Sequence, residues 1–260
     1  MAETPFYVPV GDEELLFKAA FSKGLAVMLK GPTGCGKTRF VEAMAHQLGR
    51  PLISVACHED LTAADLVGRH LLEGGETVWV DGPLTRAVKE GAICYLDEVV
   101  EARQDTTVVL HPLGDHRREL TVDRLGVTYQ AAPGFQLVVS YNPGYQSVLK
   151  DLKDSTRQRM VSIELGFPPP EVEEKVVAAE TGLGGDVVAT LVQIGQAIRR
   201  SGAGSLREVA STRTLVTAGH LIVAGVPIRR AVLAGVTGPL SDDPGLAAGL
   251  EELISTFVGD

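Results

Sequence analysis

Short apolar runs alternate with segments of helical periodicity over the first two thirds of the chain. Strands that are covered on both faces need apolar side chains on both faces, so such runs predict the strands of a buried parallel sheet. Five runs fit this description, at residues 25–30, 51–56, 92–96, 135–141 and 161–165. Together with the helical segments between them, they predict an α/β fold of three layers around a five-stranded parallel sheet.

Two connecting segments carry the periodicity of helices. Residues 37–48 place apolar side chains at helical spacing, and Gly49 follows as a C-cap, which predicts a helix directly after the first strand. Residues 99–113 are predicted to form another helix, ended by Pro112 and Gly114.

Two other segments alternate polar and apolar residues, as β-hairpins do. Residues 77–80 suit a small hairpin, and residues 117–130 predict a second hairpin with Gly126 at a turn. Neither is needed to close the predicted sheet. We therefore expect residues 66–80 and 117–130 to be insertions at the surface, where function tends to reside.

The last third of the chain changes character after three consecutive prolines, at positions 168 to 170. Every later segment has helical periodicity or helix-ending residues. The predicted helices span residues 171–181, 187–200, 211–224, 227–236 and 244–258. The sequence thus predicts two domains, an α/β domain at 1–167 and a small all-helical domain at 168–260.

Composition narrows the classes of function. The chain has 260 residues, 45% of them hydrophobic, which is enough for two domains with proper cores. A formal net charge of −9 disfavours nucleic acid or an anionic membrane as the main partner. No apolar run approaches the about 20 residues that span a bilayer, and no secretory signal is visible. The three cysteines lack metal-ligand spacing, so reduced thiols in a cytoplasmic protein are expected.

Residues 31–38 read GPTGCGKT and match the phosphate-loop pattern Gly-x-x-x-x-Gly-Lys-Ser/Thr between a predicted strand and a predicted helix. Glycines let the backbone aim its N–H groups at a phosphate, and the helix N-terminus adds partial positive charge. Lys37 is expected to reach the β- and γ-phosphates, and the Thr38 hydroxyl to ligate Mg²⁺. The motif therefore predicts a nucleoside triphosphate site. Its residues are Gly31, Pro32, Thr33, Gly34, Cys35, Gly36, Lys37 and Thr38.

A second chemical landmark ends the third predicted strand, where residues 92–98 read AICYLDE. A buried parallel strand delivers such acids to the carboxyl edge of the sheet, where α/β folds bind ligands. Asp97 is placed to hold Mg²⁺, and Glu98 to orient and polarise an attacking water. Because kinases need no hydrolytic water, Glu98 favours an ATPase over a nucleotide kinase. A nucleotide-controlled scaffold that hydrolyses little is disfavoured by intact Lys37, Asp97 and Glu98.

Taken in order, these motifs resemble those of an AAA+ ATPase. They are GPTGCGKT, ICYLDE, the strand end VVSYNP, Arg157-Gln-Arg159 and the Ala-Ser-Thr-Arg of 210–213. Residues 65–68 (DLVG), with Gly82-Pro83 and the hairpin before Phe135, look like the helix-2 and pre-sensor insertions of the MoxR branch. In the last third, STRTLVTAGHLI and AVLAGVTGPLSDD are similar to the CbbQ/NorQ/NirQ group within that branch. The resemblance covers nearly the whole chain.

The resemblance also implies roles for three further residues. Without the resemblance, Asn142 before Pro143 is interpreted as a turn residue, because Asn-Pro is a common turn pair. By the likeness, Asn142 is sensor 1, Arg159 is the arginine finger, and Arg213 is sensor 2 on a lid helix that also contacts the nucleotide. Arg157 lies two residues from Arg159 and could share or take the finger's role.

The partners follow from the same likeness. In the family the finger reaches into the neighbouring subunit's site, which implies a homo-hexameric ring that hydrolyses ATP with Mg²⁺. The family's adaptor is a protein with a von Willebrand factor A domain, of the CbbO/NorD type. Rubisco is the expected remodelling target, and nitric oxide reductase or another metalloenzyme is the alternative.

Overall fold

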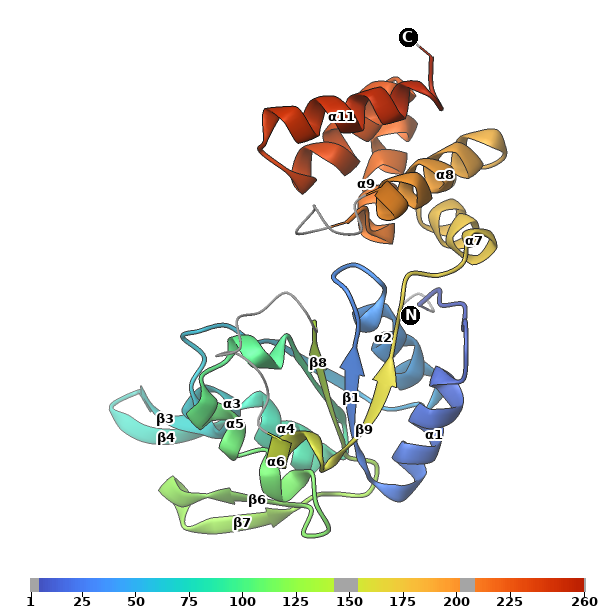
Figure 1. The fold of residues 1–260 in the computed structure, drawn as a ribbon. Coiled ribbons are helices and arrows are strands. Elements are labelled where there is room, and N and C mark those ends of the chain that lie inside the picture. The colour runs from blue at the N-terminus through green and yellow to red at the C-terminus, as the bar shows by residue number, and fades with distance from the viewer. Residues whose placement is uncertain (1–4, 143–153, 202–208, 260) are drawn as a thin grey trace. The chain divides into compact units, whose positions relative to one another are not determined.

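A five-stranded sheet forms the centre of the first part of the chain, in the order β2–β5–β8–β1–β9. Every pairing in it is parallel. Figure 1 labels three of its strands, β8, β1 and β9. This computed structural model describes residues 5–142, 154–201 and 209–259. The predicted five-stranded parallel sheet is confirmed. Its strands are β1 (Ala26–Lys30), β2 (Leu52–Ala56), β5 (Ile93–Asp97), β8 (Gln136–Tyr141) and β9 (Met160–Glu164).

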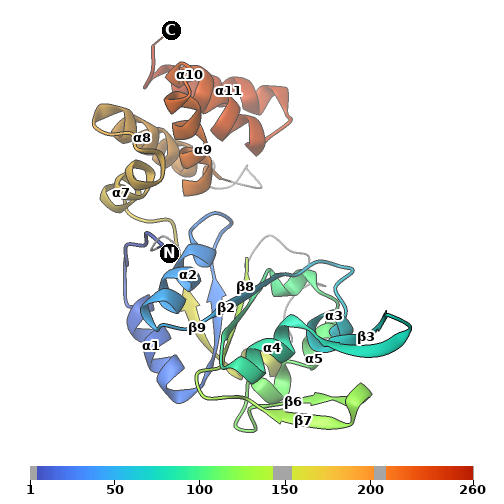
Figure 2. The same ribbon diagram turned by 180° about the vertical axis from the view of Figure 1, so that it is seen from behind.

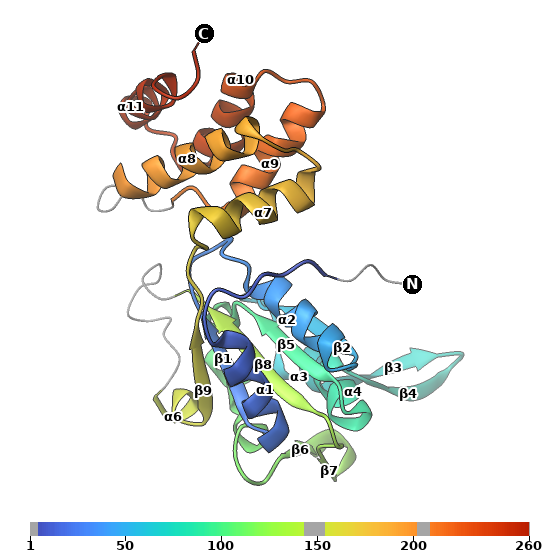
Figure 3. The ribbon, with the colours of Figure 1, turned by 90° about the vertical axis from the view of Figure 1, so that its right-hand side faces the viewer.

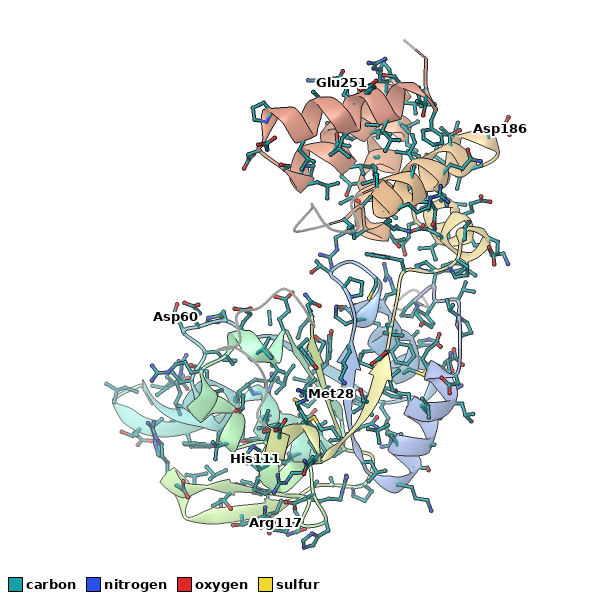
Figure 4. The ribbon with its side chains drawn as sticks, in the orientation of Figure 1. Met28, Asp60, His111, Arg117, Asp186 and Glu251 are labelled. Atoms are coloured by element: carbon teal, nitrogen blue, oxygen red, sulfur yellow. The ribbon has the colours of Figure 1, made fainter. Side chains whose placement is uncertain are left out.

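Helices cover both faces of this sheet. Alternate residues of each strand point to opposite sides, so apolar strands present side chains on both faces for helices to pack against. Met28 of β1 packs in one apolar cluster with Leu84 and Val88 of α4 (Pro83–Glu90). The alternate residue Val27 is equally buried and faces the other side. There α1 (Glu13–Lys23) contacts β1 and β9, as Figure 3 shows. Figure 4 labels Met28, which lies on the α4 side of the sheet.

The predicted helix at 99–113 is wrong. The segment breaks into a 3₁₀ turn at Val99–Glu101, a short helix α5 (Gln104–Val108) and another 3₁₀ turn at His111–Leu113. Ala102 and Arg103 adopt extended backbone conformations, with ψ of 155° and 146°, which interrupts any continuous helix. Apolar spacing alone did not reveal this, because Val99, Val100, Leu110 and Leu113 are all buried despite the breaks.

Both predicted hairpins are present, and the first is longer than the sequence suggested. The first pairs β3 (Gly68–Glu73) with β4 (Glu76–Asp81), and the second pairs β6 (Glu119–Val122) with β7 (Val127–Gln130). Gly126 lies at the second turn with a φ of 64°, as predicted. The β6–β7 hairpin contacts α4 through β7, and Figure 2 shows the two elements close together.

Arg118 anchors the base of the β6–β7 hairpin to the sheet. Its guanidinium donates to the carbonyl of Gly24, just before β1, and to that of Phe135, just before β8, the latter at 2.8 Å. Burial lowers the pKa of the Arg118 guanidinium from its usual value. The hairpin is therefore tied to the starts of the two strands whose other ends carry the candidate site.

The second compact unit comprises residues 166–260 together with two short segments, 6–10 and 32–36; the described part of 166–260 is mainly helical. A single apolar cluster fills its interior, including Leu191 and Ile194 of one helix and Leu215 of another. No helix among the described residues is both long and apolar enough to cross a membrane. Its helices are α7 (Pro170–Thr181), α8 (Asp186–Ser201), α9 (Thr212–Val223), α10 (Ile228–Val232), which continues as a π-helical turn, and α11 (Pro244–Ser255).

Candidate active site

The phosphate-loop motif connects the end of β1 to α2 (Lys37–Gln47), as the sequence predicted. Gly34 and Gly36 have φ values of 73° and 101°, which side chains other than hydrogen rarely permit. Gly31 is extended, with a φ of 159°. The loop thus adopts a glycine-dependent path immediately before a helix N-terminus, the arrangement that binds anions through backbone N–H groups.

Lys37 is buried, with 7% of its surface exposed. Its ammonium donates to the Gly31 carbonyl at 2.8 Å and to Oδ1 of Asn142 at 2.6 Å. These contacts hold the buried charge at the mouth of the loop, since a buried ammonium must be hydrogen-bonded. The structure therefore brings Lys37 and Asn142 together, although 105 positions separate them in the sequence. Pro143, the other half of the predicted turn pair, lies outside the described residues.

Asp97 ends β5, and three hydroxyl groups surround its carboxylate. The Tyr95 hydroxyl donates to Oδ1 at 2.7 Å, and the Ser140 hydroxyl donates to the same oxygen. Thr38 donates to the other oxygen, Oδ2, at 3.3 Å. The carboxylate is thereby fixed in orientation, and its second oxygen faces the loop helix.

Glu98 follows in the left-handed region, with φ of 54° and ψ of 47°. Few residues other than glycine adopt this conformation, and such positions recur at functional sites. Its backbone N–H donates to the Ser140 hydroxyl at 3.0 Å, while its side chain is exposed. Ser140 thus bonds both acidic residues at once: its hydroxyl donates to Asp97 and accepts from Glu98.

Tyr95 and Ser140 were not among the predicted site residues. Strand periodicity could have indicated both, because each lies two positions before a predicted site residue at, or just past, the end of its strand. Tyr95 precedes Asp97 on β5, and Ser140 precedes Asn142 at the end of β8. Ser140 is fully buried, which is unusual for a serine without a task. Burial raises the pKa of the Tyr95 hydroxyl, so Tyr95 stays protonated and able to donate.

Cys57 lies immediately behind these acids. Its backbone N–H donates to the Asp97 carbonyl at 2.9 Å. Burial, followed by the negative charges of Asp97 and Glu98, raises the pKa of the Cys57 thiol to about 12. The thiol therefore stays neutral and acts as a packing group. All three cysteines are free thiols.

The donor set suits Mg²⁺ bound together with a nucleotide. Mg²⁺ is held by one or two protein oxygens plus phosphates and waters rather than by a dedicated protein cage. The Thr38 hydroxyl and the Asp97 carboxylate supply two such oxygens 3.3 Å apart. Within the part of the chain that the structure describes, no group of three or more His, Cys, Asp or Glu side chains could hold a metal without phosphates.

Arg159 is not brought to this site. It directly precedes Met160, which pairs with Ala26 at the start of β1, whereas the phosphate loop follows the end of β1. Arg159 therefore lies at the end of the sheet opposite the phosphate loop. The length of β1, about 16 Å, separates the two. Its Nε lies 3.6 Å from Oδ2 of Asp115, and its side chain is 35% exposed. Arg157 ends the short helix α6 (Asp154–Arg157) beside it.

Arg213 belongs to the helical unit, on the first turn of α9. Ser211 caps this helix by accepting from the Thr214 N–H at 3.3 Å. The Arg213 side chain is exposed, whereas its neighbour Thr212 is buried. Arg213 is thus presented at the surface, at the start of α9.

Comparison with protein families assigns both parts of the chain. Residues 26–160 match the AAA domain (dynein-related subfamily), and residues 173–257 match the CbbQ/NirQ/NorQ C-terminal region. A solved structure of a candidate ATPase from Cytophaga hutchinsonii covers 97% of this chain and 91% of its own, with a TM-score of 0.54 and 17% identity. That likeness shows a shared fold.

Relatives of known name match over almost the full length. The chain is 58% identical to Protein NorQ of Paracoccus denitrificans and 56% identical to Denitrification regulatory protein NirQ of Stutzerimonas stutzeri, over 99% of this chain and 95% and 94% of those proteins. It is 54% identical to Protein CbbQ of Hydrogenophilus thermoluteolus, over 97% of this chain and 95% of that protein. The chain therefore belongs to the CbbQ/NirQ/NorQ family of AAA+ ATPases.

Proposed function

We propose that the residues gathered at the carboxyl edge of the sheet carry out ATP hydrolysis. Lys37 and the N–H groups of the loop bind the β- and γ-phosphates, and Thr38 and Asp97 hold Mg²⁺, which when bound neutralises phosphate charge. Glu98, exposed at the edge and held in a left-handed turn, orients the attacking water. Asn142 already bonds Lys37, so its amide lies where the γ-phosphate of a bound nucleotide would meet the lysine.

The arginine finger acts in trans in this proposal. Its support is the position of Arg159 at the sheet edge opposite the phosphate loop, too far to serve the site of its own chain. Such a finger completes the site of a neighbouring subunit and stabilises charge on the transferred phosphoryl group. A closed ring of identical subunits, a hexamer by family likeness, provides every site with a finger because each interface repeats the same contact.

Arg213 is proposed to report the state of the nucleotide. An exposed arginine on the first turn of α9 can pair with the γ-phosphate of ATP and loses that partner after hydrolysis. The difference in contacts gives the helical unit a preference for one nucleotide state, which is what a conformational cycle requires. A nucleotide kinase would need neither this arginine nor the water-orienting Glu98.

The work of this cycle is proposed to be remodelling of a protein partner. The observation that carries the proposal is the β3–β4 hairpin, whose Leu72 is 77% exposed near the turn. Val78 and Val80 of the same hairpin are each 40% exposed as well, and several exposed apolar side chains on one hairpin suit contact with another protein. We propose that a protein with a von Willebrand factor A domain connects the ring to its target.

Two target enzymes are proposed. The resemblance of the C-terminal third and the 54% identity to Protein CbbQ support Rubisco, whose active site the motor would open to release a tightly bound sugar phosphate. The 58% and 56% identities to NorQ and NirQ support nitric oxide reductase as the second candidate. The sequence identities to NorQ and CbbQ, 58% and 54%, are similar, so one experiment should test both target enzymes.

The experiment combines the purified chain, its cognate adaptor and ATP with each target. In the first arm, carbon fixation by sugar-phosphate-inhibited Rubisco is followed. In the second, nitric oxide reductase is produced with and without the chain and adaptor, and nitric oxide consumption is measured. Recovery in one arm, lost with Lys37→Ala, identifies the target class. If neither arm responds while ATP is hydrolysed normally, remodelling of these enzymes is excluded and the ATPase assignment stands.

A further inference from the structure

The helical unit contains a carboxylate that is completely removed from solvent. Glu173 lies near the start of α7 and is 0% exposed. Burying a carboxylate is costly unless charged and hydrogen-bonding partners replace the lost water. Glu173 has three such bonds, and they come from two other helices. The residue therefore belongs to a network of polar side chains inside a largely apolar core.

Arg199 of α8 supplies two of these bonds. Its Nη1 and Nη2 donate to the two carboxylate oxygens of Glu173 at 2.8 and 2.6 Å, a bidentate fork that fixes both groups. Its Nε donates to the Ala210 carbonyl at 2.6 Å, and its guanidinium lies 4.2 Å from the centre of the Phe167 ring. Ala210 directly precedes the cap residue of α9, so the arginine holds the chain at the entrance to that helix.

Thr212 supplies the third bond. Its hydroxyl donates to Oε1 of Glu173 at 2.6 Å. Thr212 is the first residue of α9, and the next residue is Arg213. Successive side chains on a helix point about 100° apart. Fixing Thr212 inward against Glu173 therefore fixes the direction in which Arg213 leaves the helix.

The network is not needed to begin or to bury the helix. Ser211 already caps α9, and Leu215 and Ala218 of the same helix are fully buried in the apolar cluster. Buried ion pairs seldom add stability over apolar residues of equal volume, but they can select one arrangement among several. Here the arrangement selected is the rotation of α9 about its own axis.

We propose that Glu173, Arg199 and Thr212 are positioning residues for Arg213, which aim it at the γ-phosphate. The proposal rests on the role of Arg213 given under Proposed function. Phe167, stacked on the same guanidinium, belongs to the segment that leads into the helical unit. The network thus joins the start of this unit to the arginine that distinguishes ATP from ADP.

The test measures nucleotide preference in the full chain. Dissociation constants for a non-hydrolysable ATP analogue and for ADP are determined for the parent, Arg213→Ala, Thr212→Val and the double variant. Arg213→Ala should lower the preference for the ATP analogue about tenfold, the value of a charge-assisted hydrogen bond. Thr212→Val, which keeps shape but loses the hydroxyl, should lower it about threefold to tenfold. The double variant should match Arg213→Ala alone, because Thr212 acts through Arg213.

Three further variants complete the design. Thr212→Ser keeps the hydroxyl and should restore the parent preference. Thr217→Val is the matched control, since the Thr217 hydroxyl is exposed and donates within α9, to the Arg213 carbonyl at 3.1 Å. Arg199→Lys keeps the charge but cannot form the bidentate fork, and it provides a second reading if Thr212→Val does not fold.

The outcomes separate the two levels of the proposal. If Arg213→Ala changes the preference and neither Thr212→Val nor Arg199→Lys does, the positioning network is refuted and the role of Arg213 survives. Full additivity in the double variant would also refute it, because Thr212 would then act independently of the arginine. If Arg213→Ala leaves the preference unchanged, the role of Arg213 fails and the network loses its function with it.

Discussion

At the scale of single residues, the candidate site depends on hydroxyl groups as much as on the motif residues. Asp97 is fixed by Tyr95 and Ser140 on one oxygen and by Thr38 on the other. Hydrogen bonds to a charged group contribute about 1.5–3 kcal/mol each, so this arrangement is costly to disturb. Ser140 also holds the backbone of Glu98 in its left-handed turn. A small buried serine thereby sets the orientation of both acidic residues.

The first prediction concerns the motif residues themselves. Lys37→Ala should abolish ATP turnover because it removes the charge that pairs with the phosphates, whereas Glu98→Gln should still bind ATP and lose hydrolysis by about a hundredfold or more. Phosphate release and nucleotide binding are measured in parallel. Lys23→Ala and Glu90→Gln, at exposed helix ends, are charge-matched controls. Near-parental hydrolysis by Glu98→Gln would assign water activation to another residue.

The second prediction concerns Ser140. Ser140→Ala removes the donor to Asp97 and the acceptor for the Glu98 N–H, so we expect kcat for ATP hydrolysis to fall about tenfold. KM for ATP should change much less, because Lys37 and the loop are untouched. Ser162→Ala, on the exposed side of β9, is the control. A fall in thermal stability with unchanged kcat would make Ser140 a structural residue only.

At the scale of elements, the two hairpins differ in how they are attached. The β6–β7 hairpin is tied to the sheet through Arg118, and its Leu125 packs against the main apolar cluster. Leu125, next to the turn of this hairpin, is therefore partly buried and is not an exposed tip residue. The β3–β4 hairpin instead projects with Leu72 exposed, and its base is closed by a Gly82 N–H that donates to the Val67 carbonyl at 3.0 Å.

The base of the β3–β4 hairpin requires a glycine at position 82. A Cβ at this position would lie 2.3 Å from the Leu66 carbonyl oxygen, so only glycine allows the two segments to approach. Thr85, at the start of α4, donates to the Val67 carbonyl at 2.6 Å and holds the same junction. The base of the hairpin is thus held in place by hydrogen bonds to the Val67 carbonyl, and the two strands extend from it.

The third prediction follows for Leu72. Leu72→Ser should leave basal ATP turnover and stability nearly unchanged, within about 0.5 kcal/mol, because the side chain is 77% exposed. Remodelling of the target should be lost, since the proposed contact with the partner is removed. Leu15→Ser is the matched control, as Leu15 is 69% exposed on α1. Equal loss of turnover and remodelling would make the hairpin a structural element.

At the scale of the whole molecule, one chain does not contain a complete site under the proposed mechanism. Arg159 lies at the far edge of the sheet, held by Asp115, which also binds Arg117 at 2.7 Å. Arg117, labelled in Figure 4, holds the pKa of the Asp115 carboxyl well below its usual range. Asp115 therefore stays ionised and can keep Arg159 in place at neutral pH.

The fourth prediction tests the shared site by mixing subunits. Arg159→Ala should lower ATP turnover roughly a thousandfold. Mixed with Lys37→Ala protein, it should regain part of the activity, because some interfaces then combine an intact loop with an intact finger.

Arg157→Ala decides which of the two neighbouring arginines acts, and Arg117→Ala controls for the shared contact with Asp115. Intact assembly without any recovery in mixed rings would exclude a finger in trans.

The sequence by itself determined the sheet, the loop and the acidic strand end. Each depends on local rules: apolar runs for buried strands, glycines for the loop, and a parallel strand that delivers Asp97 to the carboxyl edge. The parallel sheet and the family were predicted correctly for this reason. The prediction of a helix at 99–113 was wrong because two residues in the middle of the segment, Ala102 and Arg103, are extended. The spacing of apolar residues does not reveal such a break, since the apolar residues on both sides of it are buried.

Only the tertiary structure decided which distant residues meet. That Asn142 bonds Lys37, that Ser140 joins Asp97 to Glu98, and that Glu173 lies beneath Thr212 all depend on contacts across 39 to 105 positions. Such contacts follow from strand order and helix packing, which involve the whole chain at once. Local pattern supplies the residue types that a site needs, and packing alone determines which of them become neighbours.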